Sequence, residues 1–219
     1  MHEKSFIYRD LKPENILFEN ESENSDIKII DFGVSRQFFK KNDDLNSIVG
    51  TPYYVAPEVL TGKYDKKVDI WSIGCIFAEL LGRNPLFPGD HYLDQIQKII
   101  SVLGSPSKED LNFITNSQAK EFVMKLPKRT KQQFSALFPK ANPVALDLLS
   151  KLLVFNPNKR YTVEQCIGHP YFEGLHNPDE EPLANNPFDW SFDDIELTKE
   201  NIQSMIYDEA LKFHPDDED

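Results

Sequence analysis

The segment from Asp69 to Leu81 constrains the fold most, because it is apolar on nearly every face of a predicted helix. It is followed by Gly82, the residue type that most often occupies the position after the last helical turn. A helix of this kind has to be buried, so other elements must surround it. With 219 residues, 40% of them hydrophobic, the chain is long enough to do this as a globular domain.

Two further helices are predicted from apolar spacing and from the residues at their ends. Residues 93–103 place five apolar side chains on one face of a helix that ends at Gly104. Asn142 and Pro143 supply an N-cap and a first-turn proline for a second helix through Leu153. The five apolar residues of the first helix are Leu93, Ile96, Ile99, Ile100 and Leu103.

Two more helices are predicted towards the end of the chain. Thr162 and Gln165 have the spacing of a capping box, which predicts a helix start at this point. A last helix is predicted to begin at Thr198 and to lie on the surface of the domain. Its apolar stripe consists of Ile202, Ile206, Ala210 and Phe213.

A small β-hairpin is predicted near the start of the chain. Residues 16–18 and 27–30 are short β-prone runs, and a polar loop, residues 19–26, separates them. The predicted fold class is therefore mostly α, of the α+β type, with a helical body and one small hairpin.

The negative charge of the chain is concentrated at its end. Residues 177–219 contain 14 acidic and 2 basic residues and so account for the whole net charge of −12. This charge argues against binding to nucleic acid, whose phosphates would be repelled. The acidic end is either a solvated terminus or a surface for basic partner peptides, and the sequence leaves both alternatives open.

The compartment is predicted from what the chain lacks. We find no apolar run long enough for a membrane span and no signal peptide at the start. Cys75 and Cys166 lie in apolar helical patterns, which is typical of buried thiols in a reducing compartment. We therefore expect a cytoplasmic protein, with a nuclear location left open.

Two loops that carry charged residues flank the predicted hairpin. One contains Asp10, Lys12 and Asn15, and the other begins with Asp31. Because strand pairing would bring these loops together, the sequence predicts a carboxylate base, a cation and two oxygen ligands suited to magnesium at one place. Phosphoryl transfer requires these groups, since its catalysis consists chiefly of orientation and charge neutralisation.

These loops resemble the catalytic loop and the Asp-Phe-Gly motif of protein kinases, and Ala56-Pro57-Glu58 follows at a kinase-like spacing. The resemblance implies a serine/threonine kinase that uses ATP and Mg²⁺. It implies that Asp10 accepts the proton of the substrate hydroxyl and that Lys12 steadies the γ-phosphate. Asn15 and Asp31 would hold magnesium, and Thr51 matches the threonine that bonds the catalytic aspartate and lysine.

The same resemblance implies regulatory and structural roles. Arg9 matches the arginine that pairs with an activating phosphate. Glu58 and Arg160 match a buried ion pair that ties the activation segment to the helical body. Asp69 matches the residue that anchors the backbone of the catalytic loop, and Tyr8, which replaces the commoner histidine, is expected to pack against the Asp-Phe-Gly turn.

From Gly82 onward the sequence is most similar to mitogen-activated protein kinases. The similarity includes LFPG at 86–89, HYLDQ at 91–95, LGSPS at 103–107 and FNPNKR at 155–160. It implies a C-terminal kinase lobe over residues 1–172 and a C-terminal extension over residues 173–219. Asp179, Glu180 and Glu181 resemble an acidic cluster that attracts the basic docking motifs of protein substrates and upstream kinases.

The activation segment, residues 31–58, departs from this family and is closer to calcium-dependent protein kinases. Asn46, Ser47 and Ile48 stand where the Thr-x-Tyr phosphorylation motif is expected, so Ser47 is the best-placed site for activation by phosphorylation. Pro52 and Val55 replace two arginines that engage the phosphotyrosine and shape the pocket for a proline in the substrate.

The nine glycines include no G-x-G pair, so a glycine-rich loop over ATP is absent from the sequence. Residues 1–6 resemble the end of the helix before the catalytic loop, and we expect the N-terminal lobe to lie outside this chain. The leading hypothesis is a catalytic lobe that is inactive alone and active when joined to an N-terminal lobe. The alternative is a noncatalytic docking module, or truncated pseudokinase, that binds basic peptides.

Overall fold

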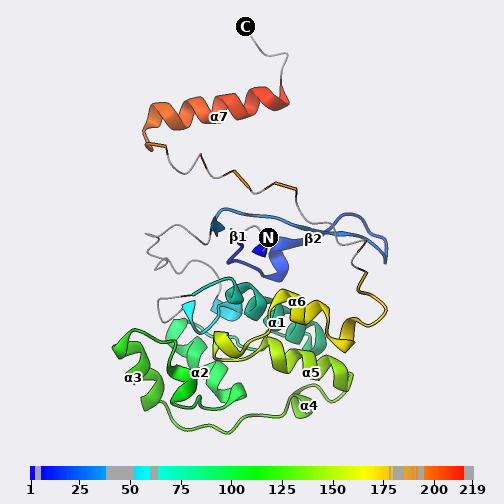
Figure 1. The fold of residues 1–219 in the computed structure, drawn as a ribbon, viewed down its shortest axis with the longest axis vertical. Helices are drawn as coiled ribbons and strands as arrows, with labels where there is room; N and C mark the ends of the chain where they lie inside the picture. Colours follow the sequence, from blue (N-terminus) through cyan, green and yellow to red (C-terminus); the bar gives the residue numbers. More distant parts are fainter. Residues whose placement is uncertain are drawn as a thin grey trace. The chain divides into compact units, whose positions relative to one another are not determined.

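The computed structural model describes residues 1–2, 6–37, 52–59, 64–177, 179, 185–186, 188–189, 191 and 195–214 (Figure 1). The chain divides into two compact units, Met1–Leu183 and Ala184–Asp219. The first unit contains all four described strands and every described α-helix but one. The predicted fold class, mostly α with a small β part, is confirmed.

The strands form two small antiparallel sheets. β2 (Ile16–Phe18) pairs with β3 (Ile27–Ile29), with Ile16 opposite Ile29, so the predicted hairpin is present. β1 (Phe6–Ile7) pairs with β4 (Arg36–Gln37), which the sequence did not predict. The prediction that residues 1–6 end a helix is wrong at Phe6, because its backbone pairs with β4; residues 3–5 lie outside the described part of the chain.

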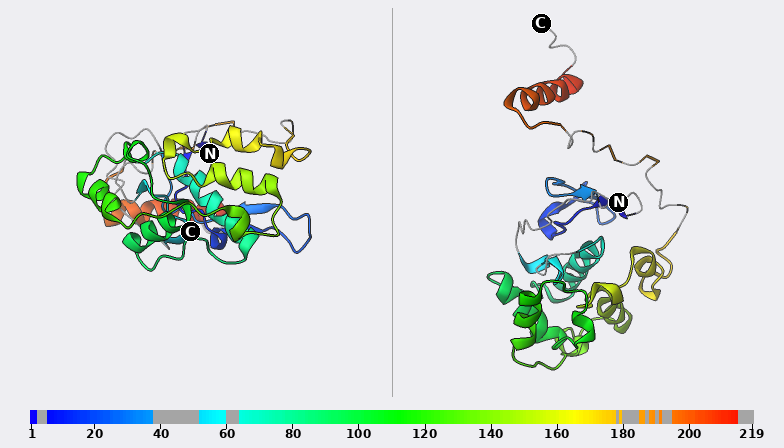
Figure 2. Two further views of the ribbon diagram at one scale, coloured as in Figure 1. Left: turned by 90° about the horizontal axis from the view of Figure 1, so that it is seen from below. Right: turned by 60° about the vertical axis from the view of Figure 1, so that its left-hand side comes forward.

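The helices of the first unit lie below the strands in Figure 1 and again in the right-hand view of Figure 2. They are α1 (Lys67–Gly82), α2 (Tyr92–Leu103), α3 (Ser117–Lys125), α4 (Phe134–Leu137), α5 (Pro143–Leu152) and α6 (Val163–Ile167). Short 3-10 helices join them, including η3 (Pro52–Tyr54) and η7 (Pro170–Phe172). α1 is central, since it contacts both α5 and η3.

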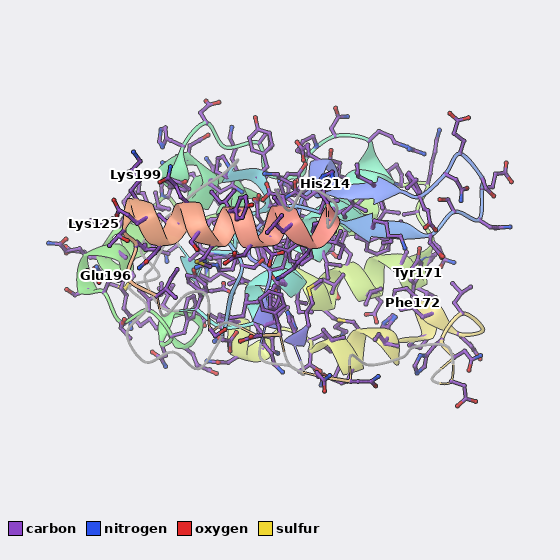
Figure 3. The ribbon with its side chains drawn as sticks, turned by 90° about the horizontal axis from the view of Figure 1, so that it is seen from above. Lys125, Tyr171, Phe172, Glu196, Lys199 and His214 are labelled. Carbon is purple, nitrogen blue, oxygen red and sulfur yellow. The ribbon has the colours of Figure 1, made fainter. Side chains whose placement is uncertain are left out.

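The core forms around α1, as its apolar sequence predicted. Trp71 and Ala78 are completely buried and pack in one cluster with residues of α2 and α5. At Gly74 an added Cβ would come within 2.8 Å of Leu153, so the close approach of α1 to the end of α5 requires glycine. A smaller cluster joins α1 to α5 and η7, where the side chains of Tyr171 and Phe172 lie next to each other (Figure 3).

Two details of α1 differ from the prediction. Ile73 and Leu80, seven residues apart on one helix face, are 42% and 62% exposed, so the helix is not buried on every side. Gly82 is the last helical residue, and Arg83 adopts the left-handed conformation after it, with φ of 62°. The main-chain N–H of Arg83 closes the helix by donating to the carbonyl of Glu79.

The ends of the other helices follow their predicted signals. Gly104, with φ of 82°, ends α2; the side chain of Asn142 accepts a hydrogen bond from Val144 N at the start of α5. Thr162 and Gln165 form the predicted capping box of α6. One member of the predicted apolar face of α2 is wrong, because Leu93 lies in the first turn and is 54% exposed.

In the second unit, α7 (Lys199–Phe213) begins after Thr198, whose hydroxyl accepts a hydrogen bond from Asn201 N. Figure 3 labels Lys199 and His214 at its two ends. The side chains of the predicted stripe are exposed at Ile202, Ile206 and Phe213. The placement of this helix on the surface of the domain stays a prediction.

Candidate active site

The loop before β2 gathers three of the predicted site residues. Lys12 Nζ lies 2.7 Å from Asp10 Oδ2, and both side chains are largely shielded from solvent. Asn15 is buried and its amide nitrogen donates to both the main-chain carbonyl and Oδ2 of Asp10, at 2.9 and 3.1 Å. These bonds hold the Asp10 carboxylate in one orientation, with a cation directly beside it.

The backbone of this loop is fixed from α1. Asp69, which is buried near the start of α1, accepts hydrogen bonds from Tyr8 N at 3.0 Å and from Arg9 N at 2.8 Å. Its Oδ2 also lies 2.8 Å from His2 Nε2, a contact that the sequence did not suggest. Arg9 has φ of 73°, which is strained for a residue other than glycine, so the loop needs such an anchor.

The second loop meets the first at Tyr8. Phe32 packs edge-on against the Tyr8 ring, with ring centres 5.2 Å apart, and the Tyr8 hydroxyl donates to the carbonyl of Ile30. Tyr8 therefore packs against the Asp31-Phe32-Gly33 turn, as expected. Burial of the Tyr8 ring and the nearby Asp10 carboxylate raise the pKa of its hydroxyl above the usual value for tyrosine.

Asp31 comes directly after Ile30, which forms a main-chain hydrogen bond to the first loop. Ile30 N donates to the carbonyl of Asn15 at 3.0 Å, so pairing of β2 with β3 carries Asp31 to the same end of the hairpin as Asn15. Asp31 is exposed and has φ of 59°, and its Oδ1 accepts from Gly33 N at 3.2 Å. The sequence prediction that the hairpin joins these two loops is confirmed.

The oxygen donors near the hairpin suit magnesium, which takes some of its ligands from substrate and water. They suit a metal site made of protein ligands alone less well. Asp31 offers one exposed carboxylate and Asn15 one amide oxygen. Within the part of the chain that the structure describes, no group of three His, Cys, Asp or Glu residues could hold a metal ion. Magnesium is usually bound by one or two protein carboxylates together with substrate phosphates and water, which this donor set allows.

The guanidinium of Arg9 is held beside the second loop. Its Nε donates to the carbonyl of Val34, and Nη1 donates to the Tyr64 hydroxyl at 3.0 Å. Tyr64 comes just before α1, and its contact with Arg9 was not predicted. Ser47 and Thr51, the other predicted residues of this region, lie outside the described residues.

Residues 52–59 are fixed to the helical body by side chains at several points. Arg160 donates to Glu58 through two nitrogens, at 2.5 and 3.0 Å, and neither side chain is exposed. The structure thus brings the predicted ion pair together. Ser72 donates to the carbonyl of Tyr54 at 2.9 Å, and the Tyr54 hydroxyl donates to Glu79 at 2.7 Å.

The order of these motifs and their spatial arrangement agree with a comparison to known families. Residues 1–172 match the sequence profile of the protein kinase domain. The chain belongs to the protein kinase family. Within this kinase chain, Asp10, Lys12 and Asn15 lie in the loop before β2, and Asp31 lies in the turn after β3.

Several curated relatives of this kinase are mitogen-activated protein kinases. It is 44% identical over 220 residues to extracellular signal-regulated kinase 1 of Dictyostelium discoideum, covering 99% of this chain and 41% of that protein. It is 44% identical over 216 residues to mitogen-activated protein kinase HOG1A of Wallemia ichthyophaga and 42% identical over 217 residues to mitogen-activated protein kinase 3 of Arabidopsis thaliana. Each alignment covers 98% of this chain and 58% of the relative.

The predicted resemblance to mitogen-activated protein kinases is confirmed by these relatives. The kinase chain spans about half the length of the relatives that it matches, between 41% and 58%. None of the helices in the described ranges is both long and apolar enough to cross a membrane.

One of the three predicted docking residues of the kinase is described. Asp179 is exposed, and its main-chain N–H donates to the side chain of Asn177 at 3.2 Å. Glu180 and Glu181 lie outside the described residues.

Proposed function

We propose that this chain is the catalytic lobe of an ATP-dependent serine/threonine protein kinase of the mitogen-activated type. The observation that carries the proposal is the arrangement of Asp10, Lys12 and Asn15, in which a carboxylate is held between an ammonium group and an amide. Asp31 lies at the same end of the hairpin. These residue types are the ones that phosphoryl transfer to a hydroxyl requires.

Each residue has a separate part in the proposed reaction. Asp10 orients the serine or threonine hydroxyl and takes up its proton as the hydroxyl oxygen bonds to the γ-phosphorus of ATP and the bond from that phosphorus to ADP breaks. Lys12, 2.7 Å from Asp10, neutralises charge on the phosphoryl group beside it. Asn15 and Asp31 would hold Mg²⁺, which supplies charge neutralisation on the ATP phosphates.

The complete enzyme would need an N-terminal lobe, because no glycine-rich loop occurs in the sequence. The β2–β3 hairpin supports this proposal. Leu17, Phe18 and Ile27 are 47%, 74% and 55% exposed, which is an apolar surface of the kind that another domain covers. We expect the 219-residue chain alone to bind ATP weakly and to transfer no phosphate.

The decisive experiment joins this chain to the N-terminal lobe of a related kinase and measures phosphate transfer to a generic serine/threonine substrate. Asp10→Asn and Asp31→Ala should each lower the rate about 100-fold or more, by lost proton acceptance or lost metal binding. Asp26→Asn is the matched control, because Asp26 is an exposed aspartate of the hairpin loop, away from the site.

The outcomes separate the two functions that the sequence left open. A fully active Asp31→Ala chimera, or steady turnover by the chain alone with Asp10→Asn inactive, would overturn the proposal. A chimera that binds basic docking peptides but transfers no phosphate, with or without these changes, would favour the noncatalytic docking module.

Regulation by phosphorylation at Ser47 is a further part of the proposal. A phosphate at Ser47 would pair with Arg9, whose guanidinium donates to the carbonyl of Val34 and the Tyr64 hydroxyl, both of them neutral oxygens. After treatment with an activating kinase, the Ser47→Ala chimera should stay at its basal rate while the parent is activated. Equal activation of both would count against Ser47.

Docking through the acidic cluster at 179–181 is the last part. Exposed ion pairs are worth about 0.2–1 kcal/mol each, so binding of a basic peptide should be modest and weakened by salt. Titration at low and physiological salt would compare the parent with Asp179→Asn/Glu180→Gln/Glu181→Gln. Asp216→Asn/Asp217→Asn/Glu218→Gln removes the same charge near the end of the chain and serves as the control. Equal binding by the first variant and the parent at low salt would rule the cluster out.

A further inference from the structure

Gln95 is a buried polar side chain whose position the proposed chemistry leaves unexplained. It lies in the first turn of α2 and is completely buried. Its Oε1 accepts a hydrogen bond from Gly89 N at 3.1 Å, and its Nε2 donates to the carbonyl of Tyr53 at 3.1 Å. One amide therefore ties together two stretches of main chain that are 36 residues apart in sequence.

The surroundings of Gln95 are shaped for this role. A Cβ on Gly89 would come within 2.5 Å of Gln95 Oε1 and 2.6 Å of its Cα, so only glycine allows this approach. The amide has to be oriented with its nitrogen towards Tyr53, because the carbonyl there can only accept and Gly89 N can only donate. An apolar side chain of the same size would remove the bond to the Tyr53 carbonyl, whereas Gly89 N would keep its hydrogen bond to the carbonyl of Phe87 at 3.0 Å.

Gln95 binds Tyr53 near the start of residues 52–59, and a continuous set of contacts connects it with Glu58 near their end. Phe87, two residues before Gly89, stacks on Trp71 with ring centres 5.7 Å apart. Arg160 lies over the Trp71 ring, 5.0 Å from its centre, and binds Glu58. The two ends of residues 52–59 are thus held by one packed network.

Near the start of residues 52–59, the main chain is held at two consecutive carbonyls. Gln95 binds the carbonyl of Tyr53 and Ser72 binds that of Tyr54. Tyr54 and Ala56 are buried, whereas Val55 between them is partly exposed. These hydrogen bonds hold the main chain directly before Val55. They therefore fix the position and direction of the partly exposed Val55 side chain.

We propose that Gln95 is a positioning residue for the protein substrate, acting through the main chain of residues 52–59. This inference rests on the proposed function and on the kinase resemblance of the sequence, which implies that positions 52 and 55 shape the pocket for the substrate beside its phosphorylated hydroxyl. Gln95 has no hydrogen bond to Asp10, Lys12, Asn15 or Asp31 within the described residues. Its loss should therefore weaken substrate binding and leave ATP binding unchanged.

The first measurement needs no kinase activity. Amide hydrogen exchange of residues 52–59 is followed in the 219-residue chain and in Gln95→Met, which keeps the size of the side chain and removes both hydrogen bonds. We expect exchange in this stretch to become about three- to tenfold faster, as for the loss of one buried hydrogen bond. Gln97→Met is the control, because Gln97 is exposed on the same helix. Gln95→Glu, which keeps the acceptor for Gly89 and loses the donor to Tyr53, gives a second variant should Gln95→Met not fold.

The second measurement uses the chimera with an N-terminal lobe. Gln95→Met should raise KM for a peptide substrate about three- to tenfold while kcat and the KM for ATP stay within about twofold, because uniform binding of the substrate is lost. A fall in kcat with an unchanged peptide KM would assign Gln95 a structural role only, and unchanged exchange in both Gln95 variants would overturn the proposal outright. An inactive parent chimera would refute the proposed function and the substrate role with it, whereas the exchange result would still decide whether Gln95 holds the segment.

Discussion

Replacement of Arg160 tests the buried network that holds residues 52–59. The guanidinium binds both carboxylate oxygens of Glu58, donates to the carbonyl of Lys67 at 2.7 Å and to that of Val154 at 3.0 and 3.2 Å, and lies over Trp71. Methionine fits the same space and keeps apolar contact with Trp71, but it has no donor. The change therefore takes the positive charge away from the fully buried Glu58 carboxylate and removes the hydrogen bonds to the two partly buried carbonyls.

The expected cost follows from burial. Removing one partner of a buried, hydrogen-bonded ion pair costs about 3–5 kcal/mol, because the remaining charge stays in the interior. In a Glu58→Gln background, Arg160→Met should cost about 1–3 kcal/mol less, since no carboxylate is then left behind. Lys159→Met is the control, because its ion pair with Asp110 is exposed and contributes little to stability.

Urea unfolding of the purified chain, followed by circular dichroism, measures these differences at neutral pH. The four chains of the cycle and the Lys159→Met control should keep the same slope of free energy against urea. If Arg160→Met lies within about 1 kcal/mol of the control, the ion pair does not stabilise the fold as argued. Equal costs in both Glu58 backgrounds would show that the pair itself is not the source of the effect.

Three further predictions concern glycine strain, alkaline pH and thiol reactivity. Gly104→Ala should destabilise the chain by about 1–3 kcal/mol, because φ is 82° and the new Cβ would lie 2.7 Å from Lys131 N. Gly168→Ala is the control in the same urea assay and should cost less. Burial raises the pKa of Tyr54, so the stability that this hydroxyl contributes is present below about pH 10 and is lost at higher pH; Tyr54→Phe should flatten that loss in a pH series of urea unfolding. Burial raises the pKa of the Cys166 thiol to about 11, so its reaction with a disulfide reagent at pH 8 should be roughly 100-fold slower in the folded than in the unfolded chain. A folded-state rate equal to that of the unfolded chain would contradict the partial burial of this thiol.

The elements that the sequence predicted well depend on residues close together in the chain. The capping box of Thr162 and Gln165, the N-cap at Asn142 and the end of α2 at Gly104 each involve hydrogen bonds across four residues or fewer. The hairpin of β2 and β3 closes over a short polar loop. Such interactions are the same in any fold that contains the segment, so the residue types alone indicate them.

The candidate site was predictable because its residues occur in two short loops joined by that hairpin. Asp10, Lys12, Asn15 and Asp31 were assigned from motif spacing, and the structure brings the two loops together at Tyr8. Ser47, Thr51, Glu180 and Glu181 stay predictions, since they lie outside the described residues.

By itself, then, the sequence determined the helix and hairpin signals and the largely buried character of α1, and it predicted which residues carry the chemistry. Only the tertiary structure decided that Phe6 pairs with Gln37, that Leu93 faces solvent and that Gln95 lies buried between Gly89 and Tyr53. An exposed and a buried glutamine are identical in sequence, and both Gln95 and Gln97 lie on one amphipathic helix. They differ because main-chain groups of distant residues lie beside Gln95 and form hydrogen bonds with its amide. Which residue gains such partners depends on packing over the whole domain.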